Sequence, residues 1–144
     1  MFFKKNKNDN EELIKICALL IHAAKIDENF SNKEKDIIKK TVISISENKE
    51  NINDILEKAE KKEANSNQIL EFTKEVKNMS HENKIKIVES LWKIIYSNKE
   101  ADIYETGLMR KLAGLLYIDS KTMGIIKEKS RKKFSNDLLV NENV

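Results

Sequence analysis

The sequence contains no proline and only three glycines in 144 residues. Proline and glycine are common in the turns that separate strands and they interrupt helices, so their scarcity disfavours a β-rich fold and favours long helices. Aromatic residues are also few, at 6%, whereas charged residues reach 35%, a balance that suits amphipathic helices. A chain of this length can bury a core, and we predict a single all-α domain.

Cysteine is almost absent. Cys17 is the only one, which excludes an intramolecular disulfide and fits a reducing compartment. The start, MFFKKNK, lacks the apolar core of a signal peptide, and the longest apolar run near it, ICALLI (16–21), is far shorter than the roughly 20 residues that span a bilayer. We predict a cytoplasmic protein without a transmembrane segment. The alternative location is peripheral to the inner membrane, through Phe2, Phe3 and the lysines after them.

Arginine is scarce as well, because only Arg110 and Arg131 are present although the net charge is +3. Direct readout of bases relies heavily on arginine, so we do not take the positive charge as a nucleic-acid interface. The densest basic run, KEKSRKKF (127–134), is expected where the last helix ends, since cations there complement the helix dipole. The predicted partners are proteins, with no nucleic acid.

Apolar residues recur at spacings of three and four along most of the chain, which is the period of an amphipathic helix. Seven helices are expected: over about 9–26, after Ser31, from near Asn51, from about Ser66, after Ser80, from Asp102 and from near Ser120. We predict one helical domain over residues 9–135, between a flexible N-terminus (1–8) and a loose C-terminal tail (136–144). The predicted core includes Leu20, Ile37, Leu91, Trp92, Leu108 and Leu112.

Two segments at expected helix junctions match each other. DENFSNKE (27–34) is followed 71 residues later by NKEADIYE (98–105), and the same offset pairs Leu20 with Leu91 and Ile37 with Leu108. Each segment joins one helix to a helix that returns along it, as in an αα-hairpin. We therefore predict a compact bundle of about seven helices built from two pseudo-repeated αα-hairpins.

Four polar residues of these junctions, Asp27, Glu34, Asn98 and Glu105, continue or begin the apolar face of their helix. One interpretation is helix capping, because SNKE (31–34) and DIYE (102–105) have the spacing of a capping box. The other is a site for a hard cation, Ca²⁺, Mg²⁺ or Mn²⁺, which prefer carboxylate and amide oxygens. An EF-hand is excluded, since its alternating Asp/Asn ligands and central glycine are missing.

The other residues that could act as metal ligands or in catalysis do not form a catalytic pattern. His22 and His81, the only histidines, lie in no metal-binding motif, and His22 is expected at the surface of its helix. Cys17 and Trp92 lie on apolar stripes and are expected in the core. The sequence has no glycine-rich phosphate loop, nucleophile elbow or paired nucleophile and base. We predict that the protein is not an enzyme.

With these residues placed, the chain resembles the TerB family. AKIDENFSNKE resembles the family's acidic turn Asp-Gly-x-x-x-x-x-Glu, with Glu28 in place of the glycine. IIYSNKEADIYE resembles the second copy of that turn, with Asn98 in place of the aspartate and Lys99 in place of the glycine. LLIHAAKID, ESLWKIIYSN and RKLAGLLYID are similar to neighbouring segments, so the resemblance covers about residues 12–120.

The resemblance implies an all-α domain of about seven helices with an acidic, metal-binding cluster. It also implies a role in tellurite resistance and stress response, with links to membrane-associated complexes. Two functions stay open at this point. The first is a non-enzymatic TerB-like module whose acidic cluster binds a divalent cation weakly. The second is a structural module for protein–protein interaction, whose junction acids are only helix caps.

Overall fold

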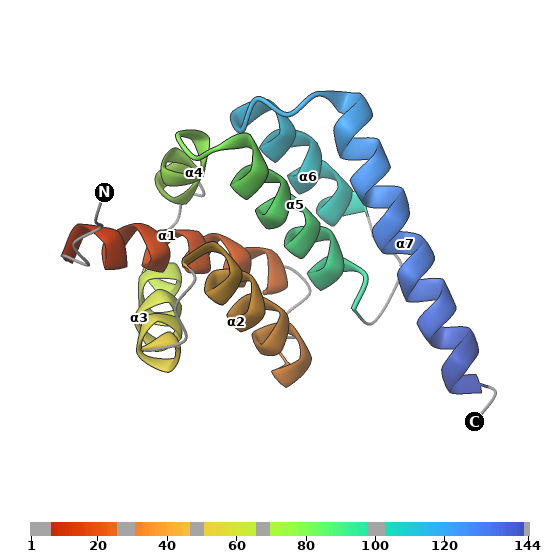
Figure 1. The fold of residues 1–144 in the computed structure, drawn as a ribbon, viewed down its shortest axis with the longest axis horizontal. Coiled ribbons are helices and arrows are strands. Elements are labelled where there is room, and N and C mark those ends of the chain that lie inside the picture. The colour runs from red at the N-terminus through yellow and green to blue at the C-terminus, as the bar shows by residue number, and fades with distance from the viewer. Residues whose placement is uncertain (1–6, 26–30, 47–50, 66–69, 98–102, 143–144) are drawn as a thin grey trace.

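The computed structural model describes residues 7–25, 31–46, 51–65, 70–97 and 103–142. Within these ranges the chain forms seven α-helices and no strand (Figure 1). The helices are α1 (Lys7–Ala24), α2 (Asn32–Ser46), α3 (Ile52–Ala64), α4 (Leu70–Lys77), α5 (His81–Ile95), α6 (Ile103–Leu115) and α7 (Ser120–Glu142). The predicted all-α fold is confirmed.

The central element is α1. All side chains of residues 16–21 are at most 3% exposed, so the middle of this helix is apolar and buried on every side. A helix of that kind must be covered all round, and α1 packs against α2, α3, α4 and α5 (Figure 1). The short apolar run ICALLI therefore marks the middle of the core.

The 71-residue register extends to the burial of side chains. Ile16, Cys17 and Leu20 of α1 are buried, and so are their counterparts on α5, Ile87, Val88 and Leu91. On the following helices, Ile37 of α2 and its counterpart Leu108 of α6 are both half-buried and packed against the core. The two helix pairs thus present corresponding faces to one core.

Most of the predicted core positions are confirmed. Leu20, Leu91, Trp92 and Leu112 are at most 2% exposed. Ile37 and Leu108 lie at the edge of the core rather than inside it. Both residues lie on the apolar face of their helix, as predicted, but the fully buried residue in each helix is the next one, Ile38 in α2 and Met109 in α6.

Local capping signals place two helix starts where the sequence predicts them. Ser80 has extended backbone angles, and its Oγ accepts a hydrogen bond from Asn83 N at 3.2 Å. Asp119 Oδ1 accepts one from Thr122 N at 2.7 Å. Each bond satisfies a backbone N–H group that has no partner within its own helix.

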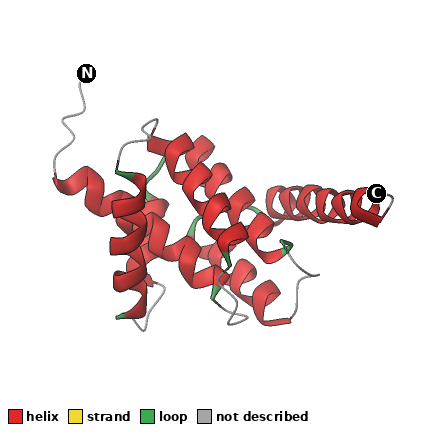
Figure 2. Cartoon of the chain, turned by 90° about the horizontal axis from the view of Figure 1, so that it is seen from below, coloured by secondary structure: helices red, strands yellow, loops and turns green. Residues whose placement is uncertain are grey.

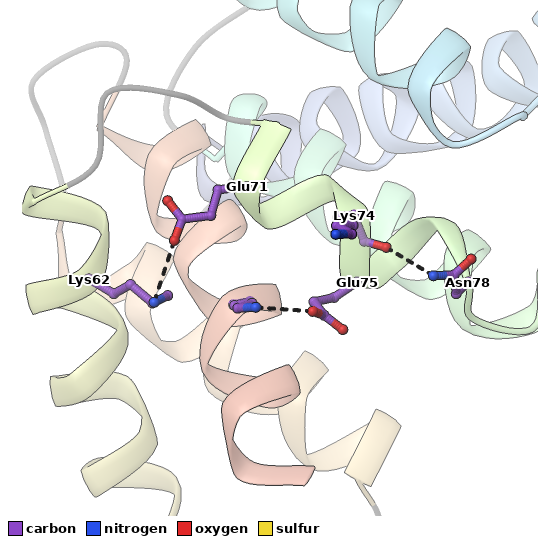
Figure 3. A network of polar contacts seen from close by, with 6 residues as sticks. Lys62, Glu71, Lys74, Glu75 and Asn78 are labelled. Atoms are coloured by element: carbon purple, nitrogen blue, oxygen red, sulfur yellow. Dashed lines mark hydrogen bonds and ion pairs between the residues drawn. The ribbon is translucent and has the colours of Figure 1, made fainter. Parts of the chain in front are cut away.

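Ion pairs join α1, α3 and α4 at the surface (Figure 3). Lys62 of α3 lies 3.6 Å from Glu71 of α4, and Lys15 of α1 lies 3.1 Å from Glu75 of α4. Their side chains are partly exposed, so each pair adds only about 0–1 kcal/mol. These contacts fix how the three helices are oriented more than they stabilise the fold.

Both ends of the helical region lie further out than predicted. α1 begins at Lys7, so residues 7 and 8 of the expected flexible N-terminus are helical, whereas residues 1–6 lie outside the described ranges. α7 continues to Glu142, so residues 136–142 are helical, where the sequence predicts a loose tail. The basic run 127–134 therefore lies inside α7 and not at its end. The reason is that the chain has no proline and no glycine after Gly124, and Asn136 and Asp137 are too weak as helix breakers to stop it.

The last helix is attached to the bundle along only part of its length. α7 packs against α5, with Met123 and Ile126 buried in the core. Figure 2 shows its C-terminal part extending beyond the other helices. The segment that holds α7 in place is thus its first half.

Candidate cation site at the helix junctions

Glu34 is the third residue of α2 and has an exposed fraction of only 1%. Its Oε2 accepts a hydrogen bond from the backbone N of Ser31 at 2.5 Å, and a second from Ser31 Oγ. The carboxylate therefore reaches back over the helix start, as a capping box requires. The Ser31 hydroxyl thus donates to this carboxylate together with the Ser31 backbone N–H.

Glu105 occupies the matching place in α6. It too is the third residue of its helix, and its exposed fraction is 2%. Glutamate is rarely buried to this extent unless it is paired, because removing a carboxylate from water is costly. Both predicted glutamate ligands are thus desolvated groups, which distinguishes them from ordinary surface caps in a first helical turn.

A lysine connects the two junctions. Lys33, next to Glu34, donates from Nζ to the backbone O of Ser97 at 2.6 Å. Ser97 follows the end of α5, where its backbone N and its Oγ both donate to Ile94 O, at 3.2 and 2.8 Å. The ammonium group therefore lies at the negative end of the α5 dipole. This contact places the first turn of α2 beside the residue that precedes Asn98.

The other two predicted ligands, Asp27 and Asn98, lie outside the described ranges. Within the described ranges, no group of three or more histidine, cysteine, aspartate or glutamate side chains is arranged to hold a metal ion. The structure thus connects the first turn of α2 to the end of α5 through Lys33 and Ser97, and shows both glutamates buried. The four-residue ligand set stays a prediction.

Sequence reasoning missed the Lys33–Ser97 contact. The two residues are 64 positions apart, and a lysine in the first turn of a helix carries no signal for a partner so distant in sequence. The only available hint was the 71-residue register, since Lys33 lies within the first of the two matching segments and Ser97 directly precedes the second.

The remaining candidate groups lie elsewhere and are occupied by structural contacts. His22 is half-buried, and its Nδ1 lies 3.3 Å from Glu63 Oε2 of α3, while Lys25 Nζ lies 3.0 Å from the other carboxylate oxygen. Cys17 is fully buried, as predicted. Burial, together with the nearby Glu60 carboxylate, raises the pKa of Cys17 to about 12, so its thiol stays protonated and unreactive.

Among the described residues, no helix combines the length and the apolar character needed to cross a membrane. Searches of curated proteins and of solved structures found no match to this chain. A scan against protein families matched residues 13–128 to the family described as tellurite resistance protein TerB. The match covers most of the chain, including both junctions, and agrees with the all-α fold. The chain therefore belongs to the TerB family.

Proposed function

We propose that the protein is a non-enzymatic, cytoplasmic binding module whose helix junctions take a divalent cation with low affinity. Ca²⁺, Mg²⁺ and Mn²⁺ are the candidates because the ligands would be carboxylate and amide oxygens. Asp27, Glu34 and Glu105 would supply charge, and Asn98 a neutral oxygen. The observation that carries the proposal is the burial of Glu34 and Glu105 at matching places in their helices, each as the third residue.

The physical argument is one of charge balance. Carboxylates that share a desolvated site repel one another, and a cation between them relieves the repulsion. Lys33 contributes one positive charge to this region, but its Nζ is directed to Ser97 O. With Asn98 in place of an acid, the site has one negative charge fewer than the family pattern, which favours weak binding.

A second function is supported by a different observation. Ser31 donates two hydrogen bonds to Glu34 Oε2, which is the behaviour of a helix cap. If both glutamates act only in this way, the protein is a structural module for protein–protein interaction. The two functions predict different responses to added cation.

The experiment is a thermal-shift series on the parent chain and on Asp27→Asn, with Mg²⁺, Ca²⁺ and Mn²⁺ in turn. A cation at a hundredfold excess over its Kd stabilises a folded protein by about 2.7 kcal/mol. For a cation site, the parent should melt higher in millimolar cation, and Asp27→Asn should lose that gain. Asp36→Asn is the matched control, since it removes one exposed carboxylate from α2 and should keep the response. A parent whose melting temperature is unchanged by all three ions would leave the capping function standing.

The family description supports a wider physiological proposal, that the module acts in tellurite resistance. From the family resemblance alone, we extend the proposal to stress response and to a larger, membrane-associated assembly. Expression of the parent chain in a tellurite-sensitive bacterial host should raise the tolerated tellurite concentration if the module acts alone. No change in tolerance would mean that the proposed role requires other components.

A further inference from the structure

Tyr117 has a backbone conformation that tyrosine rarely adopts. It follows α6 with φ at 58°, in the left-handed region. The hydrogen bonds from Ile118 N to Ala113 O, at 3.0 Å, and from Tyr117 N to Gly114 O, at 3.4 Å, form a Schellman motif with Tyr117 at the C′ position. Glycine, or less often asparagine, normally occupies that position, because a Cβ atom is unfavourable there.

The other left-handed position shows the usual solution. Among the described residues, only Asn51 and Tyr117 have positive φ without being glycine, and Asn51, at 64°, is a residue type that tolerates it. The three glycines, Gly107, Gly114 and Gly124, all lie inside helices. Tyrosine at position 117 is therefore less favourable in this left-handed conformation than asparagine, which the chain has at position 51, or glycine.

Burial of the Tyr117 side chain does not offset this unfavourable backbone conformation. Tyr117 is 70% exposed, the highest value for a large hydrophobic residue among the side chains that the structure describes. The fold anchors this turn with its neighbours instead, since Leu116 and Ile118 are buried. The ring thus projects outward from a turn whose ends are fixed.

Cations surround the exposed ring. Lys77 Nζ, at the end of α4, lies 4.9 Å from the ring centroid, and Lys84 Nζ, on α5, lies 5.7 Å from it. Lys84 also donates to Leu116 O at 3.2 Å, which holds its ammonium group beside the turn. The nearest carboxylate in the sequence, Asp119, is engaged by Thr122 N at the start of α7. Lys121 adds positive charge near this carboxylate, since it helps to lower the pKa of Asp119.

We propose that Tyr117, Lys77 and Lys84 form a docking surface for an acidic segment of a partner protein. Tyrosine is enriched among the residues that dominate binding energy at protein interfaces, and the flanking lysines supply complementary charge for carboxylates. An anionic membrane is the other surface with suitable charge. It fits less well, because binding to a membrane surface scales with the apolar area that is buried, and besides Tyr117 the described residues expose only Ile125 as a large hydrophobic side chain.

The left-handed turn provides a variant that separates binding from folding. Tyr117→Gly removes the ring and relieves the backbone, so its melting temperature should equal or exceed that of the parent. Asn51→Gly makes the same kind of change at the other left-handed site and is the matched control. For charge, Lys77→Gln/Lys84→Gln is compared with Lys58→Gln/Lys61→Gln, two exposed lysines of α3.

The probe is a phage-displayed library of random peptides of about twelve residues, selected on the immobilised full chain, followed by affinity measurements with the synthetic consensus peptide. We expect an acidic consensus whose affinity falls roughly tenfold or more in Tyr117→Gly. The Lys77→Gln/Lys84→Gln variant should also bind more weakly, with a smaller dependence on salt, while both controls should bind as the parent does.

Three outcomes would overturn the proposal. The first is a consensus without acidic residues, and the second is equal affinity of Tyr117→Gly and Asn51→Gly for the consensus peptide. The third is a particular result of sedimentation with vesicles of phosphatidylserine and phosphatidylcholine. If the parent sediments with these vesicles, Tyr117→Gly does not, and no acidic peptide is selected, the partner is a membrane.

Discussion

The indole N–H of Trp92 donates to the Sδ atom of Met123 at 3.3 Å, and this contact joins α5 to α7 inside the core. Trp92 is 2% exposed, so its N–H group has no access to water, and it stacks on Tyr96 with ring centroids 5.8 Å apart. Lys127 of α7 lies over the same indole, with Nζ 5.4 Å from the ring. The attachment of α7 thus depends on one aromatic residue and the side chains that α7 supplies to it.

Met123→Leu should therefore destabilise the fold by more than its change of shape explains. Exchange of methionine for leucine in a core usually costs less than about 1.5 kcal/mol. Here it also leaves a buried N–H group without its acceptor, which adds about 1–3 kcal/mol. Urea unfolding followed by Trp92 fluorescence measures the loss, and Met109→Leu, at a buried methionine of α6, is the control. Equal losses in the two variants would show that the sulfur contact contributes nothing.

A second prediction about stability follows from the 71-residue register between α1–α2 and α5–α6. Leu20→Ala and Leu91→Ala remove fully buried side chains from corresponding places and should each cost about 2–5 kcal/mol. Leu108→Ala should cost less, because Leu108 is half-buried at the core edge. Chemical denaturation of the three variants gives the comparison. If Leu108→Ala were the most damaging of the three, the assignment of the edge and the centre of the core would be wrong.

The residues that sequence analysis placed correctly are those with local signals. The spacing of Leu20 and Leu91 within their helices and the serine at position 80 can be recognised within a few residues of chain. Lys33 and Ser97, or Thr41 and Ser90, meet only because the helices fold together, so no short-range pattern reveals them. The end of α7 was mispredicted for a third reason, since Asn136 and Asp137 are only weak helix breakers. At the candidate site, the burial of Glu34 and Glu105 followed from their place on an apolar stripe.

Ser31→Ala tests how the buried Glu34 carboxylate is satisfied. The substitution removes the hydroxyl that donates to Oε2 and, among the described residues, leaves the backbone N–H of residue 31 as its donor. Because a buried charged group loses a partner, we expect a loss of about 1–3 kcal/mol. Ser80→Ala, which removes the exposed cap of α5, is the comparison and should cost about 0.5–2 kcal/mol. A smaller loss for Ser31→Ala than for Ser80→Ala would mean that the hydroxyl is not needed by the carboxylate.

Asp119 should make the stability depend on pH in acid. Hydrogen bonds from Thr122 lower the pKa of Asp119 below its ordinary value of 3.8. A carboxyl group whose pKa is lower in the folded state stabilises the fold above the unfolded pKa, and this contribution is lost as the pH falls through the folded pKa. Asp119→Asn should therefore weaken the dependence of stability on pH below about pH 4. Urea midpoints measured across this range check the expectation, and parallel curves for parent and variant would contradict it.

A buried hydroxyl pair offers the sharpest test of how α2 and α5 recognise each other. Thr41 Oγ1 donates to Ile37 O at 2.9 Å, so its one proton is engaged there, and the hydrogen bond between Thr41 Oγ1 and Ser90 Oγ has Ser90 as its donor. Both residues are buried, and α2 packs directly on α5. The pair is thus a buried polar contact between α2 and α5.

Removing one partner should be worse than removing both. Thr41→Val leaves the Ser90 hydroxyl buried without its acceptor, which costs about 1–3 kcal/mol, whereas replacing both polar groups by apolar ones of similar shape can be nearly neutral. We therefore expect Thr41→Val/Ser90→Ala to be at least as stable as Thr41→Val alone. A double-mutant cycle by urea unfolding gives the coupling energy, expected to be about 0.5–3 kcal/mol. Strictly additive losses would mean that the two hydroxyls do not recognise each other, and that their hydrogen bond does not help α2 to select its place on α5.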